Sequence, residues 1–549
     1  MTNREIATHF RTLANLLELL EENPFKIRSY RNAYNTLRRH DRELSSMEPK
    51  EIEKIQGVGK AISSKIGELL ETGSLNALEK ARKEIPPGVE ELLNIKGLGP
   101  GKIRKLWRGL EVQSPGELLY ACKENRLLKL KGFGQKSQRD IISKVEFYLS
   151  QQGKFLYAEL IHLAEEVLSA FESKMAGEKV ALTGKLRRKM PVLEEISLLA
   201  TGTLDNWKKI SLPNAVIEEM GDDFIRWTLE EKYPVSLHLC PAGEFGNKQL
   251  ELTGPKAFID SPPLKDNLQD QSFSSEKDLF KTLDFTYIKP EFRDWESPEK
   301  AMELPEGEIL REEDILGVVH AHSHYSDGLN SLAEMADAAL EKGFKYLAIT
   351  DHSAYAAYAG GLREKDVLEQ WAEIDRLNEK RDSFRVIKGI EADILPNGDM
   401  DYIPELLSGF ELVIASVHSV LKMDRVRATD RLIKAIENPA VHMLGHPTGR
   451  LLLSRPGYPL DMPKILDACA QNGVAIEINS NPHRLDLDWE WIRPASERGI
   501  KFSINPDAHS TAGIDDIKYG IPVAQKGGML KSECLNTLEA GDFLSMLRK

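Results

Sequence analysis

ILGVVHAHSHYSDG, residues 315–328, is the stretch that decides the fold of the carboxyl-terminal half. In it an apolar run ends in two histidines and a polar loop follows. Six more apolar runs come after it, separated by helix-like segments such as LAEMADAALEKG. Strands and helices that alternate over this length predict a parallel sheet, closed into a barrel or left open. The six runs are YLAIT (346–350), FRVIKGI (384–390), LVIASVH (412–418), HMLGH (442–446), VAIEIN (474–479) and KFSIN (501–505).

Residue types that bind metals stand where these runs end. The carboxyl ends of barrel strands meet at one mouth, so we expect their side chains to converge. So many histidines and carboxylates would repel one another or stay unpaired without cations. Imidazole mixed with carboxylate suits Zn²⁺, Mn²⁺ or Fe better than Ca²⁺ or Mg²⁺. The strand-end residues are His320, His322, Asp327, Asp351, His352, Glu391, His418, His446, Asn479, Asp507 and His509.

The motifs around these residues resemble those of the PHP (polymerase and histidinol phosphatase) domain over roughly residues 316–549. They read HAHSHYSDG, ITDHS, GIEADIL, ASVH, GHPTGR and NPDAHS. The resemblance implies an α/β barrel, a distorted (βα)7 fold with three metal ions. One ion would lie on His320, His322, Glu391 and Asp507, a second on Glu391, His418 and His446, and a third on Asp327, His352 and His509.

Phosphoester cleavage is the chemistry that this resemblance implies. Metal ions lower the pKa of a bound water and clamp phosphoryl oxygens during in-line attack. The nucleophile would be a metal-bound hydroxide held by the group of Glu391, His320, His322 and Asp507, with Mn²⁺ or Zn²⁺ as the expected metal and Fe as an alternative. Arg450 and Arg484, in GHPTGR and NPHRLDL, are candidates for binding substrate phosphate, with surface salt bridges as the other interpretation.

Three glycine turns repeat in the first 150 residues: IQGVGKAI (55–62), IKGLGPGKI (95–103) and LKGFGQKS (130–137). Glycines let such a turn approach a ligand, and the N–H groups of the following helix suit a phosphate. This head holds 27 Lys+Arg against 20 Asp+Glu, a net charge of +7 in a chain whose total is −13. A basic head suits a polyanion. The turns look like helix-hairpin-helix motifs, which hold DNA backbone, through Gly57, Gly59, Lys60, Gly97, Gly99, Lys102, Gly132, Gly134 and Lys136.

A PHP domain behind such a head is the layout of bacterial family X DNA polymerases. SYRNAY (29–34) and GVGKAISSKIGELLETG (57–73) resemble that family's small amino-terminal domain. Lys26 and Lys65 fall near its phosphate-binding and lyase lysines, but an intervening phosphate-contacting lysine is Ala61 here. We therefore expect a small all-α DNA-end-binding domain at 1–80, helical fingers at 81–152, an α+β nucleotidyltransferase-like palm at 153–253, thumb and linker at 254–313, and the PHP domain at 314–549.

The palm departs from the family pattern in TGKLRRKMPVLEEISLLATG (183–202). The family carries GS-aromatic/Leu-RRG and three aspartates that hold two Mg²⁺ ions. Gly184 and Arg188 match, Lys185 replaces the serine, and the aspartate positions are Glu195, Ser197 and Ser236. Serine lacks the carboxylate charge, and metal stabilisation of a transferring phosphoryl group is worth several kcal/mol. We expect no functional Mg²⁺ site and an inactive polymerase palm.

These features predict a monomeric DNA-repair metalloenzyme of the cytoplasm, associated with the nucleoid. It would act on gapped or recessed DNA as a 3′–5′ exonuclease, with 3′-phosphatase or abasic-site endonuclease activity as variants. The sequence has no apolar stretch near the roughly 18 residues of a membrane span, and its four scattered cysteines predict reduced packing residues. The alternatives are an active gap-filling polymerase/exonuclease, a non-catalytic DNA-end scaffold and a small-molecule phosphatase.

Overall fold

A computed structural model describes residues 1–110, 112–123, 127, 130–150, 153–261, 264, 271–453 and 456–547. The chain divides into two compact units, Met1–Gln152 and Gly153–Lys549. Residues 262–263 and 265–270 of the predicted thumb and linker lie outside the described residues. Across the described ranges, no helix combines the length and apolar character that crossing a membrane requires. All four cysteines are buried thiols.

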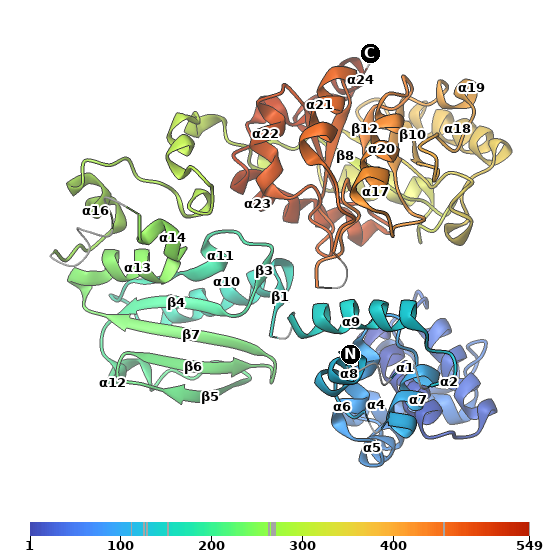
Figure 1. Cartoon of the computed structure of the whole chain (residues 1–549), viewed down its shortest axis with the longest axis horizontal. Helices are drawn as coiled ribbons and strands as arrows, with labels where there is room; N and C mark the ends of the chain where they lie inside the picture. Colours follow the sequence, from blue (N-terminus) through green and yellow to red (C-terminus); the bar gives the residue numbers. More distant parts are fainter. Residues whose placement is uncertain are drawn as a thin grey trace. The chain divides into compact units, whose positions relative to one another are not determined.

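The first unit consists of helices around one apolar core (Figure 1). Its first helix begins with a capping box, in which Thr2 and Glu5 satisfy each other's backbone N–H groups. Apolar residues at helical spacing, such as Ile6, Phe10 and Leu13, face this core. The longer helices are α1 (Asn3–Leu19), α2 (Pro24–Leu37), α4 (Lys60–Thr72), α5 (Asn76–Lys83), α7 (Pro100–Leu110), α8 (Pro115–Lys123) and α9 (Gln135–Ser150).

The second unit begins with a five-stranded sheet of order β2-β4-β7-β6-β5 (Figure 1). Strands β4 and β7 run parallel, and the other pairs are antiparallel. Helix α10 (Tyr157–Lys174) covers the apolar face, where Phe171 contacts the rings of Trp207 and Trp227. The strands are β2 (Val180–Leu182), β4 (Ile196–Thr201), β5 (Ala215–Met220), β6 (Phe224–Leu229) and β7 (Tyr233–Cys240).

Seven parallel strands then form a nearly closed barrel, as the apolar runs and the motifs predict (Figure 1). The first strand approaches the segment after the last, where the N–H of His322 donates to the carbonyl of Ala508. Buried on both faces, these strands read as nearly continuous apolar runs. They are β8 (Gly317–Ala321), β9 (Tyr346–Ile349), β10 (Arg385–Asp393), β11 (Leu412–Ser416), β12 (Met443–Leu444), β13 (Ala475–Asn479) and β14 (Phe502–Asn505).

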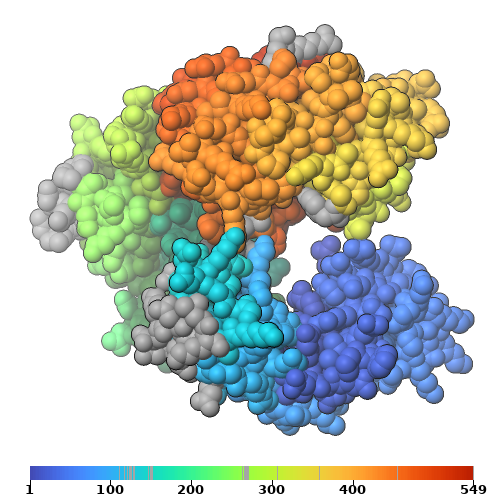
Figure 2. Space-filling view, turned by 45° about the vertical axis from the view of Figure 1, so that its right-hand side comes forward, coloured from blue at the N-terminus to red at the C-terminus, as the bar shows by residue number. Residues whose placement is uncertain are grey.

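A buried ionic cluster joins the segment that carries the five-stranded sheet to the barrel. Lys526, at the end of α23 (Ile517–Lys526), donates to the carbonyl oxygens of Arg188 and Glu291 and to the carboxylate of Asp294, at 3.0, 3.1 and 2.6 Å. Arg188 also donates to Asp294 through Nε. These contacts join residues of the sheet segment, the connecting segment and the barrel, which are coloured from green to red in Figure 2.

Candidate metal centre

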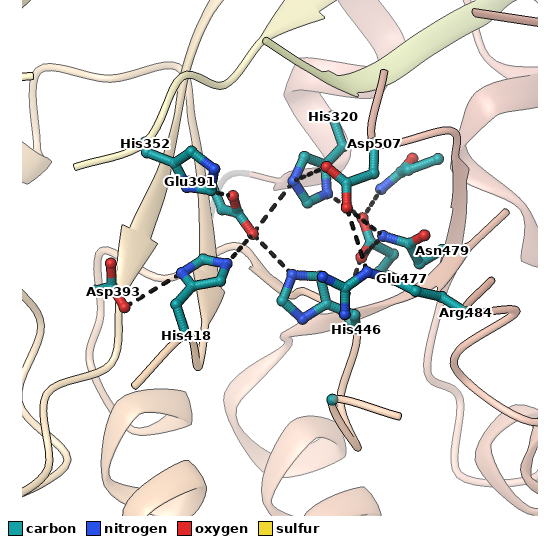
Figure 3. Close-up of polar contacts among 12 residues, drawn as sticks. His320, His352, Glu391, Asp393, His418, His446, Glu477, Asn479, Arg484 and Asp507 are labelled. Atoms are coloured by element: carbon teal, nitrogen blue, oxygen red, sulfur yellow. Dashed lines mark hydrogen bonds and ion pairs between the residues drawn. The ribbon is translucent and has the colours of Figure 1, made fainter. Parts of the chain in front are cut away.

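The carboxyl ends of the barrel strands bring the predicted metal ligands together (Figure 3). Each has a ring nitrogen or carboxylate oxygen within 4 Å of another, although they come from loops and strand ends up to 189 residues apart in the sequence. The nine residues are His320, His322, Asp327, His352, Glu391, His418, His446, Asp507 and His509.

Glu391, on β10, lies at the middle of this cluster. Its Oε1 is 2.9 Å from Nε2 of His446 and 3.1 Å from Nε2 of His418, and its Oε2 is 2.9 Å from Nδ1 of His352. Burial raises the pKa of this carboxyl, but the surrounding imidazoles hold it well below its usual range. Five imidazoles surround it within 4 Å: His320, His322, His352, His418 and His446.

The donor set fits divalent cations. Buried ligand atoms, among them Nε2 of His320, Nδ1 of His322 and Oε2 of Glu391, make no hydrogen bond with any described residue. Nitrogen and carboxylate oxygen together are the donors that Mn²⁺, Zn²⁺ and Fe accept. Ligand atoms within 4.8 Å of one another form three groups: His322, Asp327, His352 and His509; His320, His322 and Glu391; and His352, Glu391 and His418.

These groups differ in detail from the ligand sets that the resemblance implies. Asp327, His352 and His509 lie together as implied, with His322 added. His352 also lies beside Glu391 and His418, where the implied second set has His446. His446 contacts the same Oε1 of Glu391 as His418 does, and the group of His320, His322 and Glu391 lacks the implied Asp507.

Two buried carboxylates that the sequence analysis did not assign hold ligand histidines in place. Glu477, on β13, accepts from Nδ1 of His320 at 2.5 Å and from the N–H of His446 at 2.7 Å. Asp393, at the end of β10, lies 3.2 Å from Nδ1 of His418. In both imidazoles Nε2 then faces Glu391, which fixes the ring orientation. A sequence signal could have identified both residues, because each is an ionisable residue inside a buried apolar run, as in VAIEIN and GIEADIL.

Three ligands have a backbone conformation that L-residues rarely adopt. The φ angles of His320, His446 and Asp507 are 63°, 25° and 53°. Such conformations persist only where the surrounding structure holds them, and they cluster at functional sites. His320 lies near the end of the buried strand β8, and His446 and Asp507 come two residues after β12 and β14, so the barrel determines where these side chains point.

The two predicted phosphate-binding arginines occupy different places. Nε of Arg484 lies 3.6 Å from a carboxylate oxygen of Asp507, so this side chain borders the metal centre (Figure 3). The guanidinium of Arg450 instead donates to Asp488 and to the carbonyl oxygens of Arg484 and Leu485. Arg450 therefore anchors the loop that carries Arg484.

The three glycine turns of the first unit share one construction. The first glycine of each has a left-handed φ of 83°, 85° or 96°. The residue between the glycines, Val58, Leu98 or Phe133, is buried in the core. The second glycine directly precedes α4, α7 or α9, and a Cβ added there would meet nothing within 4 Å. Each turn is thus anchored by its apolar residue and open on its outer side, where Lys60, Lys102 and Lys136 are exposed.

The two other predicted DNA-binding lysines lie on different helices. Lys26, on α2, is exposed and 3.5 Å from Glu22. Lys65, on α4, is half-buried.

Three family models match this chain: a helix-hairpin-helix domain over residues 1–75, a SAM-like helix-hairpin-helix tandem over 89–146, and the PHP domain over 319–481. The DNA polymerase/3′-5′ exonuclease PolX of Bacillus subtilis (strain 168) is 32% identical over all of both chains. The chain belongs to the family X DNA polymerases, PolX. The membership predicted from the motifs is confirmed.

Part of this PolX chain is also similar to proteins named as probable phosphatases. A probable phosphatase of Thermoanaerobacter sp. (strain X514) is 29% identical over 40% of this chain and 90% of its own length. A probable phosphatase of Shewanella loihica is 30% identical over 30% of this chain and 63% of its own.

The five-stranded sheet carries Ser197 and Ser236, the two serines predicted at aspartate positions of the family pattern. The parallel register of β4 and β7 places Ser197 opposite Ser236. Ser236 donates to Oε2 of Glu195 at 2.5 Å, and the hydroxyl of Ser197 lies 2.7 Å from that of Thr183. Of the three positions predicted to align with the family's aspartates, Glu195 is the one that carries a carboxylate in this chain.

The arginine motif beside these strands is engaged within the protein. Arg188 is buried against Asp294 and the carbonyl of Thr253. Gly184, with φ +66°, lets the turn pass close to Ser197, and Nζ of Lys185 lies 2.6 Å from Glu194. The guanidinium of Arg188 is thus turned into the protein.

Proposed function

We propose that this chain is a metal-dependent phosphodiesterase of DNA repair that shortens DNA from the 3′ end at the mouth of the barrel. The observation that carries the proposal is the cluster of five imidazoles around Glu391. The first unit of the same chain has three glycine turns of a kind that suits phosphate groups. The name of the Bacillus subtilis relative, a DNA polymerase/3′-5′ exonuclease, supports it. Gapped or recessed DNA is the proposed substrate, and 3′-phosphatase and abasic-site cleavage are variants of the same chemistry. We also propose that the chain acts as a monomer in the cytoplasm, with the nucleoid.

Bound divalent ions, Mn²⁺ or Zn²⁺ with Fe as an alternative, would activate water and polarise the phosphoryl oxygens. The nine ligands would hold up to three ions. Glu477 keeps the proton of His320 on Nδ1, so that the Nε2 lone pair faces the centre. Arg484 offers its guanidinium to the substrate phosphate beside Asp507. Burial of the ligands strengthens each of these electrostatic interactions.

The helix-hairpin-helix turns would bind the DNA backbone. Their open outer sides and the exposed Lys60, Lys102 and Lys136 suit phosphates without reading sequence. Lys26 and Lys65 would bind a 5′-phosphate, and a lyase role for Lys65 is tested by borohydride trapping on a 5′-deoxyribose phosphate end. An adduct that Lys65→Ala abolishes would support it, and no adduct would exclude it.

The palm, in this proposal, holds DNA but does not extend it. One carboxylate, Glu195, remains where the family's pattern has three, and it accepts a hydrogen bond from Ser236. Loss of two metal ligands removes on the order of 10⁴ or more in rate if it costs several kcal/mol of transition-state stabilisation. Arg188 is paired with Asp294, so its guanidinium cannot bind a nucleoside triphosphate without breaking a buried contact.

An active gap-filling polymerase is the second candidate, favoured by the retained Glu195 and by the relative's name. The test is a 5′-labelled primer on a gapped template with Mn²⁺, with and without dNTPs, using wild type, His320→Ala and Glu391→Ala. Shortening that dNTPs do not reverse and that both variants lose would support the proposal. Extension that survives in both variants and is lost in Glu195→Ala would overturn the inactive palm. Binding without cleavage at any metal concentration would point to a scaffold.

A further inference from the structure

Asp351 is a strand-end residue that none of the ligand sets uses. It lies two residues after β9 and directly before the ligand His352, and it is fully buried. Its Oδ1 accepts from the N–H of Ser323 at 2.8 Å and from the hydroxyl of Ser326 at 2.5 Å. Its Oδ2 accepts from the hydroxyl of Ser323 and from Nε2 of Gln370, both at 2.6 Å. Because each oxygen takes two donors, protein groups saturate this carboxylate.

Two of these donor residues lie on the loop that follows β8. Ser323 directly follows the ligand His322, and Ser326 directly precedes the ligand Asp327. The loop is a tight turn, in which the N–H of Ser326 donates to the carbonyl of Ser323 at 3.1 Å. Asp351 therefore fastens a short turn that has a metal ligand at each end.

Helix α18 (Glu364–Asn378) contacts both Asp351 and this loop. Gln370, buried on this helix, is the residue that donates to Asp351. Glu373, three residues later, accepts from the hydroxyl of Tyr325 on the loop at 2.9 Å. Residues three apart lie on one helix face, so a single face of α18 holds Asp351 and the loop together.

Asp327 belongs to the outer part of the metal centre. Its side chain is 34% exposed and that of His509 is 40% exposed, whereas the other seven ligand side chains are at most 9% exposed. Asp327 and His509 occur only in the group that also contains His322 and His352. A side chain open to water has few contacts of its own to hold it. The position of Asp327 therefore depends on the loop that carries it.

We propose that Asp351 positions Asp327 for one divalent cation, the outermost of the centre, and binds no ion itself. The hydrogen bonds to Ser323 and Ser326 fix the loop, so that the Asp327 carboxylate stays 3.3 Å from Nε2 of His509. Without the Asp351 carboxylate the loop loses this anchor and the outermost ion site weakens. The sites around the buried Glu391 do not use the loop residue Asp327 and keep their ions. This role rests on the proposed metal-dependent function.

The experiment measures bound metal. Metal-free protein is dialysed against a series of Mn²⁺ concentrations, and Mn²⁺ per chain is determined for wild type, Asp351→Asn, Ser326→Ala and Ser326→Thr. The control for the aspartate is Asp467→Asn, at an exposed residue of α21 (Met462–Asn472) that pairs with Arg498. The control for the serine is Ser408→Ala, at an exposed hydroxyl before β11. The Tm of each metal-free protein reports on folding alone.

Asp351→Asn should bind one Mn²⁺ fewer than wild type and need about 10- to 100-fold more Mn²⁺ to fill that site, with the other sites unchanged. Ser326→Ala, which removes one hydrogen bond, should weaken the same site about 2- to 10-fold. Ser326→Thr keeps the hydroxyl and should bind Mn²⁺ as wild type does, and so should both controls. A merely structural role would lower the Tm of the metal-free protein and weaken all sites together.

Equal weakening of every site, or unchanged Mn²⁺ binding in Asp351→Asn, would overturn the positioning role. If Asp351→Asn does not fold, Ser326→Ala decides: loss at one site supports the role, and wild-type binding overturns it. A wild-type protein that binds no Mn²⁺ would overturn the proposed metal-dependent function instead.

Discussion

Glu477→Gln should weaken the metal centre although it removes no metal ligand and changes no volume. Four donors point at the carboxylate: Oε1 accepts from His320 Nδ1 and Asn505 Nδ2, and Oε2 accepts from the N–H of His446 and Asn479 Nδ2. Either orientation of a glutamine amide turns its NH₂ group toward two of these donors. His320 also loses the charge that keeps its proton on Nδ1. Changes of this kind typically cost 10- to 100-fold in metal affinity or activity.

The assay is Mn²⁺ titration followed by cleavage at saturating metal, with the exposed Glu497→Gln as control. The metal concentration for half-maximal activity should rise about 10- to 100-fold in Glu477→Gln, equivalent to about 1.4–2.8 kcal/mol, and stay unchanged in the control. A Glu477→Gln protein that is folded and needs no more metal than wild type would show that the carboxylate does not orient His320.

Three further outcomes follow from the structure. Chelation of the metal should abolish cleavage and lower the Tm by about 5–10 °C, because ions bound only to the folded state stabilise it; an unchanged Tm would mean that the ions are not bound in the purified protein. Lys526→Met should lower the free energy of unfolding of the second unit by about 3–5 kcal/mol, measured by urea unfolding. The reason is that Asp294 and two carbonyl oxygens lose the buried cation that they contact. The control Lys464→Met, at an exposed residue, should cost less than about 0.5 kcal/mol. Glu276 is buried, which raises its pKa, but Arg187 and Arg293 lower it to about 2. Its contribution of about 3 kcal/mol should be complete above about pH 5 and be lost as the pH falls towards 2, so the stability difference between wild type and Glu276→Gln should shrink over that window.

The barrel could be predicted from the sequence because its signals are local. The strands are apolar runs, as expected for a parallel sheet that is covered on both faces, and each run is followed by a polar loop. Parallel strands bring those ends to one mouth whatever the details of packing, so His320, Glu391 and Asp507 could be grouped without coordinates. The glycine turns are equally local, because a left-handed φ at Gly57 depends on the absence of a side chain.

The sequence did not reveal the contacts between residues that are far apart in the chain and are not related by a regular spacing. Glu477 looks like one polar residue in a buried strand until the barrel places it 2.5 Å from His320, 157 residues earlier in the chain. Arg188 matches the RRG pattern of the family, yet its contacts with Asp294 and Lys526 turn it inward. The sequence by itself therefore determined the strands, the gathering of histidines and carboxylates at the barrel mouth and the glycine turns, because each depends on a local pattern. Only the tertiary structure decided which buried charges pair, because pairing depends on how distant elements pack and a buried charge is stable only beside its partner.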